Sequence, residues 1–331
     1  MTMSEQPSIK TTLVEVTDKL QDPPCRIFFK NEYEQPSGSF KLRGMGHLIH
    51  ESISQAKAQG KSNVRVFSSS GGNAGLAAAY SAKYYGLPCT VVLPDTSKAN
   101  VIAKLQSFGA EVIIHGKHWG EADSYLKELV AGLDDSEYPV YCHPFDNALL
   151  WQGHGNFIDE LTEQLSAEDL AKVKGVVCSV GGGGLYNGVV EGLKRNPALC
   201  KVPILAIETK QAPTFNEAIK QGKVVHLSQV NTLATSLASP YLSEKSLENH
   251  SSHKTHVVEI EDLDAVQGVL DMYDLFGLMV EPACGASVSV AFKRQDLLKS
   301  FDVKSDDIVV VIACGGSGVT EEILQQYRSL V

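Results

Sequence analysis

The composition of this 331-residue chain excludes several classes of protein. Hydrophobic residues make up 43% and charged residues 21% of it, which is the balance of a globular protein and not of a disordered, collagen-like or disulfide-scaffold chain. The formal net charge is −10, from 29 Lys and Arg against 39 Asp and Glu. Because nucleic-acid binding requires clustered basic residues, no nucleic-acid partner is expected. At roughly 100–200 residues per domain, the length predicts two or three domains.

Neither the start of the chain nor its apolar stretches predicts a membrane or secreted protein. The longest strongly apolar stretch, Ile308 to Cys314, has seven residues, whereas a membrane span needs about 20. Residues 1–14 include Glu5 and Lys10 and show no apolar signal core. The seven cysteines are widely spread and include no C-x-x-C pair, which favours a reducing compartment. We therefore expect a cytoplasmic protein without a membrane partner.

The first half of the chain alternates strand-like segments with helix-like segments that are each followed by a glycine. The expected strands are 64–68, 89–93 and 111–115, and the expected helices are 73–85, 98–108 and 121–130. Three strand–helix units in succession are typical of a parallel sheet with right-handed crossovers.

The alternation resumes after an interruption at Pro139 and Pro144. An amphipathic pattern predicts one long helix over 150–165, and the polar stretch 222–255 allows no assignment. The remaining expected strands are 175–180, 203–208 and 308–313, and the remaining expected helices are 185–195, 264–276 and 286–301. The chain is therefore predicted to form two doubly wound α/β domains with mostly parallel sheets.

Four consecutive glycines, Gly181, Gly182, Gly183 and Gly184, stand between an apolar strand and the helix that begins at Leu185. The alternative is a flexible turn, but a strand-to-helix turn does not need four glycines. Such a run lets backbone N–H groups approach an anion at a helix N-terminus, which predicts a phosphate site. The G-x-G-x-x-G spacing of dinucleotide-binding folds is not met.

A second motif, Pro-Ser-Gly-Ser-Phe-Lys-Leu-Arg-Gly at 36–44, marks a turn that enters a helix. Ser39 is a candidate cap for a helix from Phe40 to about residue 58. Lys41 then lies in the first turn, where the helix dipole disfavours a cation and so favours the neutral amine of a covalent nucleophile. The alternative, which composition alone favours, is a solvated lysine at a helix start.

Two further segments follow expected strands. The run Ser-Ser-Ser-Gly-Gly-Asn-Ala-Gly at 68–75 presents hydroxyls, an amide and backbone N–H groups at a helix start, which suits a substrate carboxylate. Cys314 ends the last strand and precedes Gly315, where parallel α/β sheets build their sites. A lone cysteine is, however, more often inert core.

Together these motifs resemble those of the fold-type II pyridoxal-phosphate (PLP) enzymes, whose fold is like that of the tryptophan synthase β subunit. The segment 36–44 resembles the Schiff-base lysine motif of the serine/threonine dehydratase group, 70–75 its substrate-carboxylate loop, and 181–185 its phosphate loop. His-Pro-Phe-Asp at 143–146 and Glu-Pro-Ala-Cys-Gly-Ala at 281–286 also fit. Order and spacing match across essentially the whole chain, and the likeness is strongest to the catabolic L-serine/L-threonine dehydratases of animals and fungi.

The resemblance implies a role for individual residues. Lys41 would hold the cofactor and act as the catalytic base. Phe40 would stack on the cofactor ring, Asn73 would hold the ring hydroxyl, and Cys314 with Gly315 would face the pyridine nitrogen. The implied phosphate-binding residues are Gly181, Gly182, Gly183, Gly184 and Leu185. The implied substrate-binding residues are Ser70, Gly71, Gly72, Asn73 and Ala74.

The resemblance also implies features beyond the catalytic residues. Glu208, with backbone oxygens of Ala212 and Ser236, would bind a monovalent cation such as K+. A smaller domain at 45–140 would be inserted into a larger domain formed by 1–44 plus 141–331. The protein would be a homodimer that acts on a small amino-acid substrate.

The implied reaction is PLP-dependent β-elimination, which converts L-serine to pyruvate or L-threonine to 2-oxobutanoate with release of ammonia, in amino-acid catabolism and gluconeogenesis. Ala74 stands where biosynthetic threonine deaminases and serine racemases typically have His, and the end at Val331 leaves no room for a regulatory domain. Gly71 stands where the animal enzymes usually carry Ala, which leaves the serine-over-threonine preference open.

Three alternatives remain. An amino-acid racemase or a β-replacement synthase could use the same fold, but Gly71 offers no acid on the second face, and no second-substrate signature is present. A non-enzymatic regulatory or binding protein could also have kept the fold. The intact Lys41 and the full glycine run argue against that third alternative.

Overall fold

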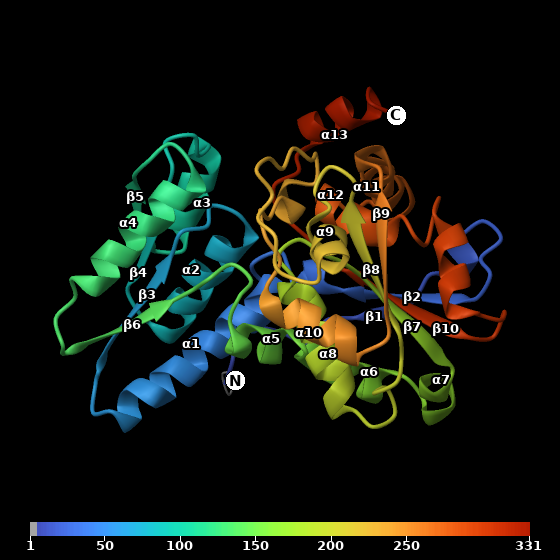
Figure 1. Cartoon of the computed structure of the whole chain (residues 1–331), viewed down its shortest axis with the longest axis horizontal. Helices are drawn as coiled ribbons and strands as arrows, with labels where there is room; N and C mark the ends of the chain where they lie inside the picture. Colours follow the sequence, from blue (N-terminus) through green and yellow to red (C-terminus); the bar gives the residue numbers. More distant parts are fainter. Residues whose placement is uncertain (1–4) are drawn as a thin grey trace. The chain divides into compact units, whose positions relative to one another are not determined.

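The computed structural model describes residues 5–331, which fall into two compact units (Figure 1). The smaller unit contains the described residues up to Ile9 together with Gln35–Gly153, and the larger unit contains Lys10–Glu34 with His154–Val331. This division assigns 35–44 and 141–153 to the smaller unit, whereas the resemblance implies that they belong to the larger domain. None of the helices described within 5–331 combines the length and the hydropathy that crossing a bilayer requires.

The smaller unit is built on a four-stranded parallel sheet in the order β5-β4-β3-β6. Its strands are β3 (Asn63–Ser68), β4 (Cys89–Leu93), β5 (Glu111–Ile114) and β6 (Glu137–Tyr141). Its helices are α1 (Lys41–Ala58), α2 (Asn73–Tyr85), α3 (Ala99–Ser107), α4 (Trp119–Ala131) and α5 (Ala148–His154), the last of which ends at the boundary of the unit.

Both faces of the sheet are buried at the central strands β3 and β4, which explains why these strands are apolar without a strict alternation. Successive side chains of a strand leave on opposite faces. Val66 therefore packs into the core that contains α1, α2 and α3, while the next residue, Phe67, packs with Ala122 and Leu126 of α4.

The larger unit is built on a six-stranded sheet in the order β1-β2-β10-β7-β8-β9, in which only the β1–β2 pair is antiparallel. Its strands are β1 (Leu13–Glu15), β2 (Arg26–Asn31), β7 (Val173–Ser179), β8 (Ile204–Thr209), β9 (Thr255–Ile260) and β10 (Ile308–Ala313). β10 lies between β2 and β7, and all of its residues are buried. Because β7, β8 and β10 are parallel, their carboxyl ends share one edge of the sheet.

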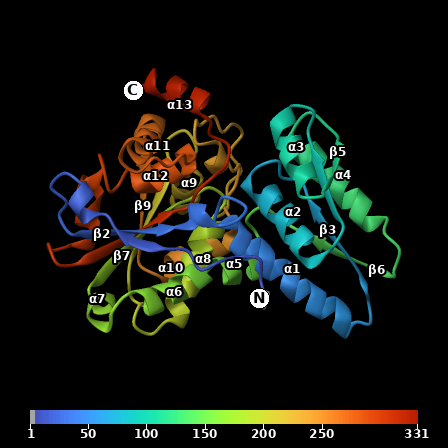
Figure 2. The ribbon, with the colours of Figure 1, turned by 180° about the vertical axis from the view of Figure 1, so that it is seen from behind.

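Helices cover both faces of the larger sheet, with α11 and α12 on one side and α6 and α8 on the other (Figures 1 and 2). The helices are α6 (Asn156–Gln164), α7 (Ala167–Ala171), α8 (Gly184–Arg195), α9 (Thr214–Gln221), α10 (Glu244–Ser252), α11 (Asp262–Phe276), α12 (Pro282–Val288) and α13 (Glu321–Arg328). Short 3-10 helices span Thr17–Lys19, Glu32–Glu34, Thr235–Leu237 and Gln295–Phe301.

The predicted α/β fold with mostly parallel sheets is confirmed, but two predicted helices are wrong in extent. The helix expected over 150–165 is divided into α5 and α6 at Gly155, which packs so closely on α8 that an added Cβ would lie 2.9 Å from Gly188 O. The helix expected over 286–301 stops at Val288. There the Ser289 hydroxyl donates to Ala286 O, a side-chain bond that competes with helical pairing.

Candidate active site

Lys41 is the first residue of α1 in the smaller unit, as the motif predicts. Its Nζ donates a hydrogen bond to the backbone oxygen of Pro144 and lies 5.2 Å from the centroid of the Phe40 ring. The expected cap by Ser39 is wrong, since Phe40 occupies the cap position with helical backbone angles and no side chain caps α1. The hydroxyls of Ser37 and Ser39 are buried and have no hydrogen-bond partner within the described part of the chain. Two such buried hydroxyls suit a polar ligand.

His143 holds the turn that carries the Pro144 carbonyl. Its Nδ1 accepts the backbone N–H of Asp146 at 2.8 Å. Burial lowers the pKa of His143 to about 4, although the nearby Asp123 charge acts in the opposite direction. A neutral imidazole whose Nδ1 accepts carries its proton on Nε2. The ring therefore stabilises the turn without placing a second positive charge near Lys41.

The serine loop, which we define as residues 68–72, connects β3 to α2 in the smaller unit. Ser70 Oγ accepts the backbone N–H of Gly72 at 3.2 Å, and the first turn of α2 begins at Asn73. A Cβ added to Gly71 would lie 3.3 Å from Leu93 Cδ2 and 3.5 Å from Val101 Cγ1. The space left by the missing side chain is thus bounded by two apolar side chains of this unit.

Asp123 of α4 anchors the serine loop, and no sequence motif indicated it. Its Oδ1 accepts hydrogen bonds from Ser69 Oγ at 2.7 Å and from the Tyr141 hydroxyl at 2.6 Å. Its Oδ2 lies 2.7 Å from Lys127 Nζ. Burial raises the pKa of Asp123, but the hydrogen bonds from Lys127, Tyr141 and Ser69 outweigh burial and hold the pKa below its ordinary value. Asp123 is therefore an ionised, buried anchor.

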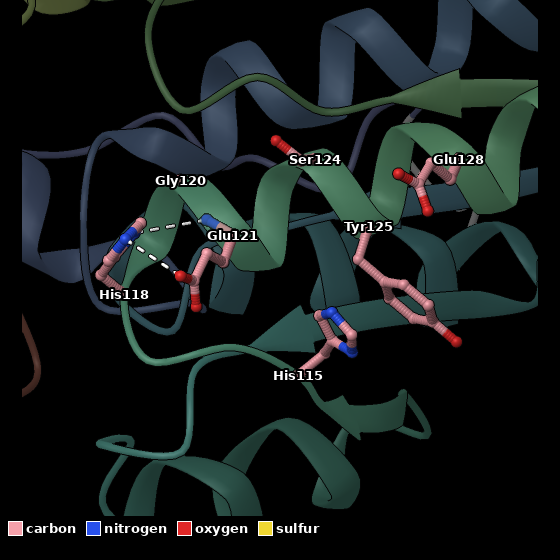
Figure 3. A pocket seen from close by; sticks show the side chains of 7 residues that line it. All are labelled: His115, His118, Gly120, Glu121, Ser124, Tyr125 and Glu128. Atoms are coloured by element: carbon pink, nitrogen blue, oxygen red, sulfur yellow. Dashed lines mark hydrogen bonds and ion pairs between the residues drawn. The ribbon is translucent and has the colours of Figure 1, made fainter.

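An open hollow of about 370 Å³ lies along α4 (Figure 3). In it, His118 Nε2 lies 3.3 Å from Glu121 Oε1, and the His115 and Tyr125 rings stack with centroids 4.0 Å apart. Its lining residues are His115, His118, Gly120, Glu121, Ser124, Tyr125 and Glu128. None of these is a predicted site residue. Across residues 5–331, no three or more His, Cys, Asp and Glu side chains gather in a way that could hold a metal ion.

In the larger unit the glycine run turns from β7 into the N-terminus of α8. Gly183 has a φ of +93°, and a Cβ there would lie 2.0 Å from Ser246 Oγ, so only glycine fits. Gly182 O accepts the backbone N–H of Ser243 at 3.0 Å. Leu185 follows as a buried residue of the first helical turn. The run therefore has a defined shape at a helix N-terminus, as a phosphate loop requires.

Cys314 directly follows β10 and is 5% exposed. Its Sγ lies 3.8 Å from the Ser179 hydroxyl at the end of β7. The Cys284 thiol has a raised pKa. The main cause is its burial, and the second cause is its hydrogen bond with Cys314. Cys314 and the glycine run thus follow neighbouring strands at one edge of the sheet.

Glu208, the candidate cation ligand, is the penultimate residue of β8 and is fully buried. It accepts the backbone N–H groups of Phe215 at 2.8 Å and Asn216 at 2.9 Å. Burial raises the pKa of Glu208 to about 8, although these two donors lower it. Ala212 O accepts the N–H of Thr214, and the Ser236 hydroxyl donates to Glu281. The cation site stays a prediction.

The predicted site residues fall on both units. Those of the smaller unit are Phe40, Lys41, Ser70, Gly71, Gly72, Asn73 and Ala74. Those of the larger unit are Gly181, Gly182, Gly183, Gly184, Leu185, Glu208, Ala212, Ser236, Cys314 and Gly315.

A family model matches the sequence of this chain, including the lysine at a helix start and the glycine run before another helix. Residues 5–315 match the model described as pyridoxal-phosphate dependent enzyme, and the chain belongs to that family.

Individual relatives are similar over nearly the whole chain. The sequence is 44% identical over 309 residues to L-serine dehydratase of Saccharomyces cerevisiae, which covers 92% of this chain and 91% of the yeast protein. It is 38% identical to the human protein named serine dehydratase-like, over 97% of this chain and 94% of that one. The structure of a fungal L-serine ammonia-lyase from Rhizomucor miehei matches with a TM-score of 0.85 at 30% identity, over 98% of this chain and 99% of that chain. The predicted resemblance is confirmed.

The residues present fit the cofactor of this family. The glycine run leads into the N-terminus of α8, where the helix dipole favours an anionic group and glycines let backbone N–H groups approach it. In the smaller unit, Lys41 offers a primary amine, and the buried hydroxyls of Ser37 and Ser39 have no hydrogen-bond partner within the described residues. Taken one unit at a time, an aldehyde suits the amine of Lys41, and a phosphate suits the glycine run.

Proposed function

We propose that this protein is a PLP-dependent L-serine ammonia-lyase that also acts on L-threonine. It removes the β-hydroxyl and the α-amino group, and the products are pyruvate or 2-oxobutanoate and ammonia. The observation that carries the proposal is the near full-length similarity to L-serine dehydratase, in a chain whose Lys41 begins α1 as the motif predicts.

The glycine run and Leu185 would hold the phosphate of PLP. Phe40 would stack on its ring, Asn73 would hold its ring hydroxyl, and Cys314 with Gly315 would face its nitrogen. When bound, PLP supplies the electron sink that makes the Cα–H bond of an amino acid acidic. A thiol facing the ring nitrogen supplies no full charge there, in contrast to a carboxylate, and this favours elimination over transamination.

Lys41 would remove the proton from Cα as the general base. The Pro144 carbonyl accepts a hydrogen bond from Lys41 Nζ and so orients the amine. His143 stabilises the turn that presents this carbonyl and is neutral at pH 7, so it adds no charge that would compete with Lys41.

The serine loop would bind the substrate carboxylate through hydroxyls and backbone N–H groups at the N-terminus of α2. Ser70, Gly71, Gly72, Asn73 and Ala74 would contribute to this binding. Asp123 keeps the loop in place through its hydrogen bond with Ser69. Because Lys127 neutralises the charge of Asp123, this carboxylate does not repel the substrate carboxylate.

A cation, a partner subunit and a compartment complete the proposal. Glu208, Ala212 and Ser236 would hold K+. The support is the buried carboxylate of Glu208, whose raised pKa a bound cation would lower. Assembly as a homodimer in the cytoplasm rests on the resemblance and on the cysteine pattern.

The test is an assay for 2-oxo acid formation with L-serine and L-threonine, together with the visible absorption spectrum of the purified protein. We expect a yellow protein that forms 2-oxo acid from both substrates. Chiral chromatography of the recovered serine separates the alternatives, since D-serine without 2-oxo acid would indicate a racemase. A colourless protein without turnover would contradict the proposal.

A further inference from the structure

Four side chains behind the glycine run of the larger unit form one hydrogen-bonded cluster. Asn187 lies in the first turn of α8, Ser243 directly precedes α10, and Ser246 and Asn249 lie on α10. Each of the four is at most 1% exposed. None of them belongs to the motifs that predicted the site.

Three of these side chains close into a ring. Asn187 Nδ2 donates to Ser243 Oγ at 2.9 Å, and Ser246 Oγ donates to Asn187 Oδ1 at 3.1 Å. The two hydroxyl oxygens are 2.9 Å apart. Because Ser246 gives its only proton to Asn187, Ser243 donates to Ser246. All three bonds therefore run in the same direction around the ring, so that each one polarises and strengthens the next.

Asn249 secures the ring from outside. Its Nδ2 donates to Asn187 Oδ1 at 3.0 Å, and its own Oδ1 accepts from Lys194 Nζ at 3.0 Å. Asn187 Oδ1 thus accepts two hydrogen bonds, which uses both of its lone pairs. A flipped Asn187 amide would direct an N–H group at Asn249 Nδ2, whose own orientation is set by the Lys194 ammonium on Asn249 Oδ1, so the orientation of the Asn187 side chain is determined.

The ring contacts the glycine run directly. The backbone N–H of Ser243 donates to Gly182 O, and the backbone N–H of Asn187 donates to Gly183 O at 2.8 Å. The Gly183 backbone rests on Ser246 Oγ, which lies 2.0 Å from the place of a Cβ. A serine directly before a helix normally caps it. The Ser243 hydroxyl makes no cap hydrogen bond to α10 and takes part in the ring instead.

We propose that Asn187, Ser243 and Ser246 are positioning residues for the cofactor phosphate. The ring holds the glycine run in the shape that directs its N–H groups toward a phosphate. The inference deepens the proposed function and rests on it, since it takes the glycine run as the PLP phosphate site. An amide and two hydroxyls order the run without a charge, whereas a carboxylate in the same place would repel the phosphate.

The test compares two ligands that differ only in the phosphate. Apo-protein is titrated with PLP and with pyridoxal for the wild type, Ser246→Ala, Ser243→Ala and the double variant. The matched control is Ser289→Ala, since Ser289 is a buried serine of the same unit that donates one hydrogen bond outside the ring. We expect each ring variant to weaken PLP binding about five- to thirty-fold and to leave pyridoxal binding unchanged.

The PLP affinity of the double variant should be no lower than that of whichever single variant has the lower affinity, because one substitution is enough to open the ring. Ser243→Ala keeps Ser246, the side chain nearest to the Cβ position of Gly183, and is the test if Ser246→Ala does not fold.

Two results would overturn the inference alone while wild-type PLP binding stands. One is unchanged PLP affinity with a lowered unfolding temperature, and the other is an equal loss of PLP and pyridoxal affinity. Failure of the wild type to bind PLP, or wild-type affinity in Gly183→Asp, would instead overturn the proposed phosphate site and the inference with it.

Discussion

The serine loop and the glycine run occupy equivalent places in the two units but are held by different chemistry. Each connects the carboxyl end of a parallel strand to a helix, from β3 to α2 and from β7 to α8. The serine loop is anchored by the ionised carboxylate of Asp123. The glycine run is anchored by the neutral ring of Asn187, Ser243 and Ser246.

The difference follows from what each loop has to hold. An ionised anchor makes strong hydrogen bonds, but its negative charge repels an anionic ligand unless a cation such as Lys127 neutralises it. A neutral ring is weaker per bond but needs no counter-charge, and its hydrogen bonds do not depend on pH. The two anchors should therefore respond differently to mutation and to acid.

The largest expected effect comes from a residue outside both anchors. Lys41→Ala removes the general base and should lower the rate of 2-oxo acid formation from L-serine by about 10²–10⁴-fold or more. Neither loop changes, so the far-ultraviolet circular dichroism spectrum should match that of the wild type. Near-normal turnover in this variant would show that another residue is the base.

Gly183→Asp should damage the glycine run more than any change at its anchor. The substitution adds a side chain at a φ of +93°, places Cβ on Ser246 Oγ, and adds a negative charge to the run that would hold the phosphate. The backbone strain alone predicts at least about a tenfold loss of PLP affinity in a titration of apo-protein. Gly183→Ala is the control that separates strain from charge, and equal losses in both variants would exclude a role for charge.

Asp123→Asn should affect substrate binding and spare cofactor binding. Asparagine keeps the shape but loses the charge that pairs with Lys127 and accepts from Ser69 and Tyr141. We expect the KM for L-serine to rise about five- to thirty-fold, with an unchanged dissociation constant for PLP. Ser289→Ala is again the control, and a rise in the PLP dissociation constant would contradict the separation of the two anchors.

His143 makes the smaller unit sensitive to moderate acid. Its pKa is about 4 in the folded chain against an ordinary 6.5, so between these values only the unfolded chain binds a proton. The contribution to the free energy of unfolding is complete above pH 6.5 and falls as pH drops toward 4. Denaturant titrations at several pH values should show this slope, and His143→Gln should remove it.

The smallest effect belongs to Asp123 and appears at lower pH. Its folded pKa is below the ordinary 3.8, so its stabilisation is complete above 3.8 and is lost as pH falls through the folded value. The difference in unfolding free energy between wild type and Asp123→Asn should therefore shrink only below pH 3.8. The difference in unfolding free energy between wild type and Ser246→Ala should not change with pH. If this difference also shrinks below pH 3.8, the neutral ring is coupled to a titrating group.

Local patterns were sufficient to predict most elements near the motifs. The apolar strands 64–68, 89–93 and 308–313 and the glycine-ended helix 73–85 are predictable because burial and capping act on neighbours in sequence. The prediction of a helix over 286–301 was wrong, because a hydrophobic periodicity does not reveal the hydrogen bond of the Ser289 hydroxyl to Ala286 O. The stretch 222–255 contains α10 among irregular segments, and its polar composition gave no periodic signal.

The family, the lysine and the two loops could be predicted from the sequence, because those features are runs of adjacent residues with chemistry of their own. The side chains that hold the loops could not be predicted, because they come together only when the chain folds. Asp123 lies 54 residues from Ser69, and Asn187 lies 56 residues from Ser243. A lone buried Asp or Asn carries no local signal, since its partner is chosen by how strands and helices pack. The hydroxyl of Ser243 makes this clearest, because a serine directly before a helix normally caps it, whereas packing turns this one toward Asn187.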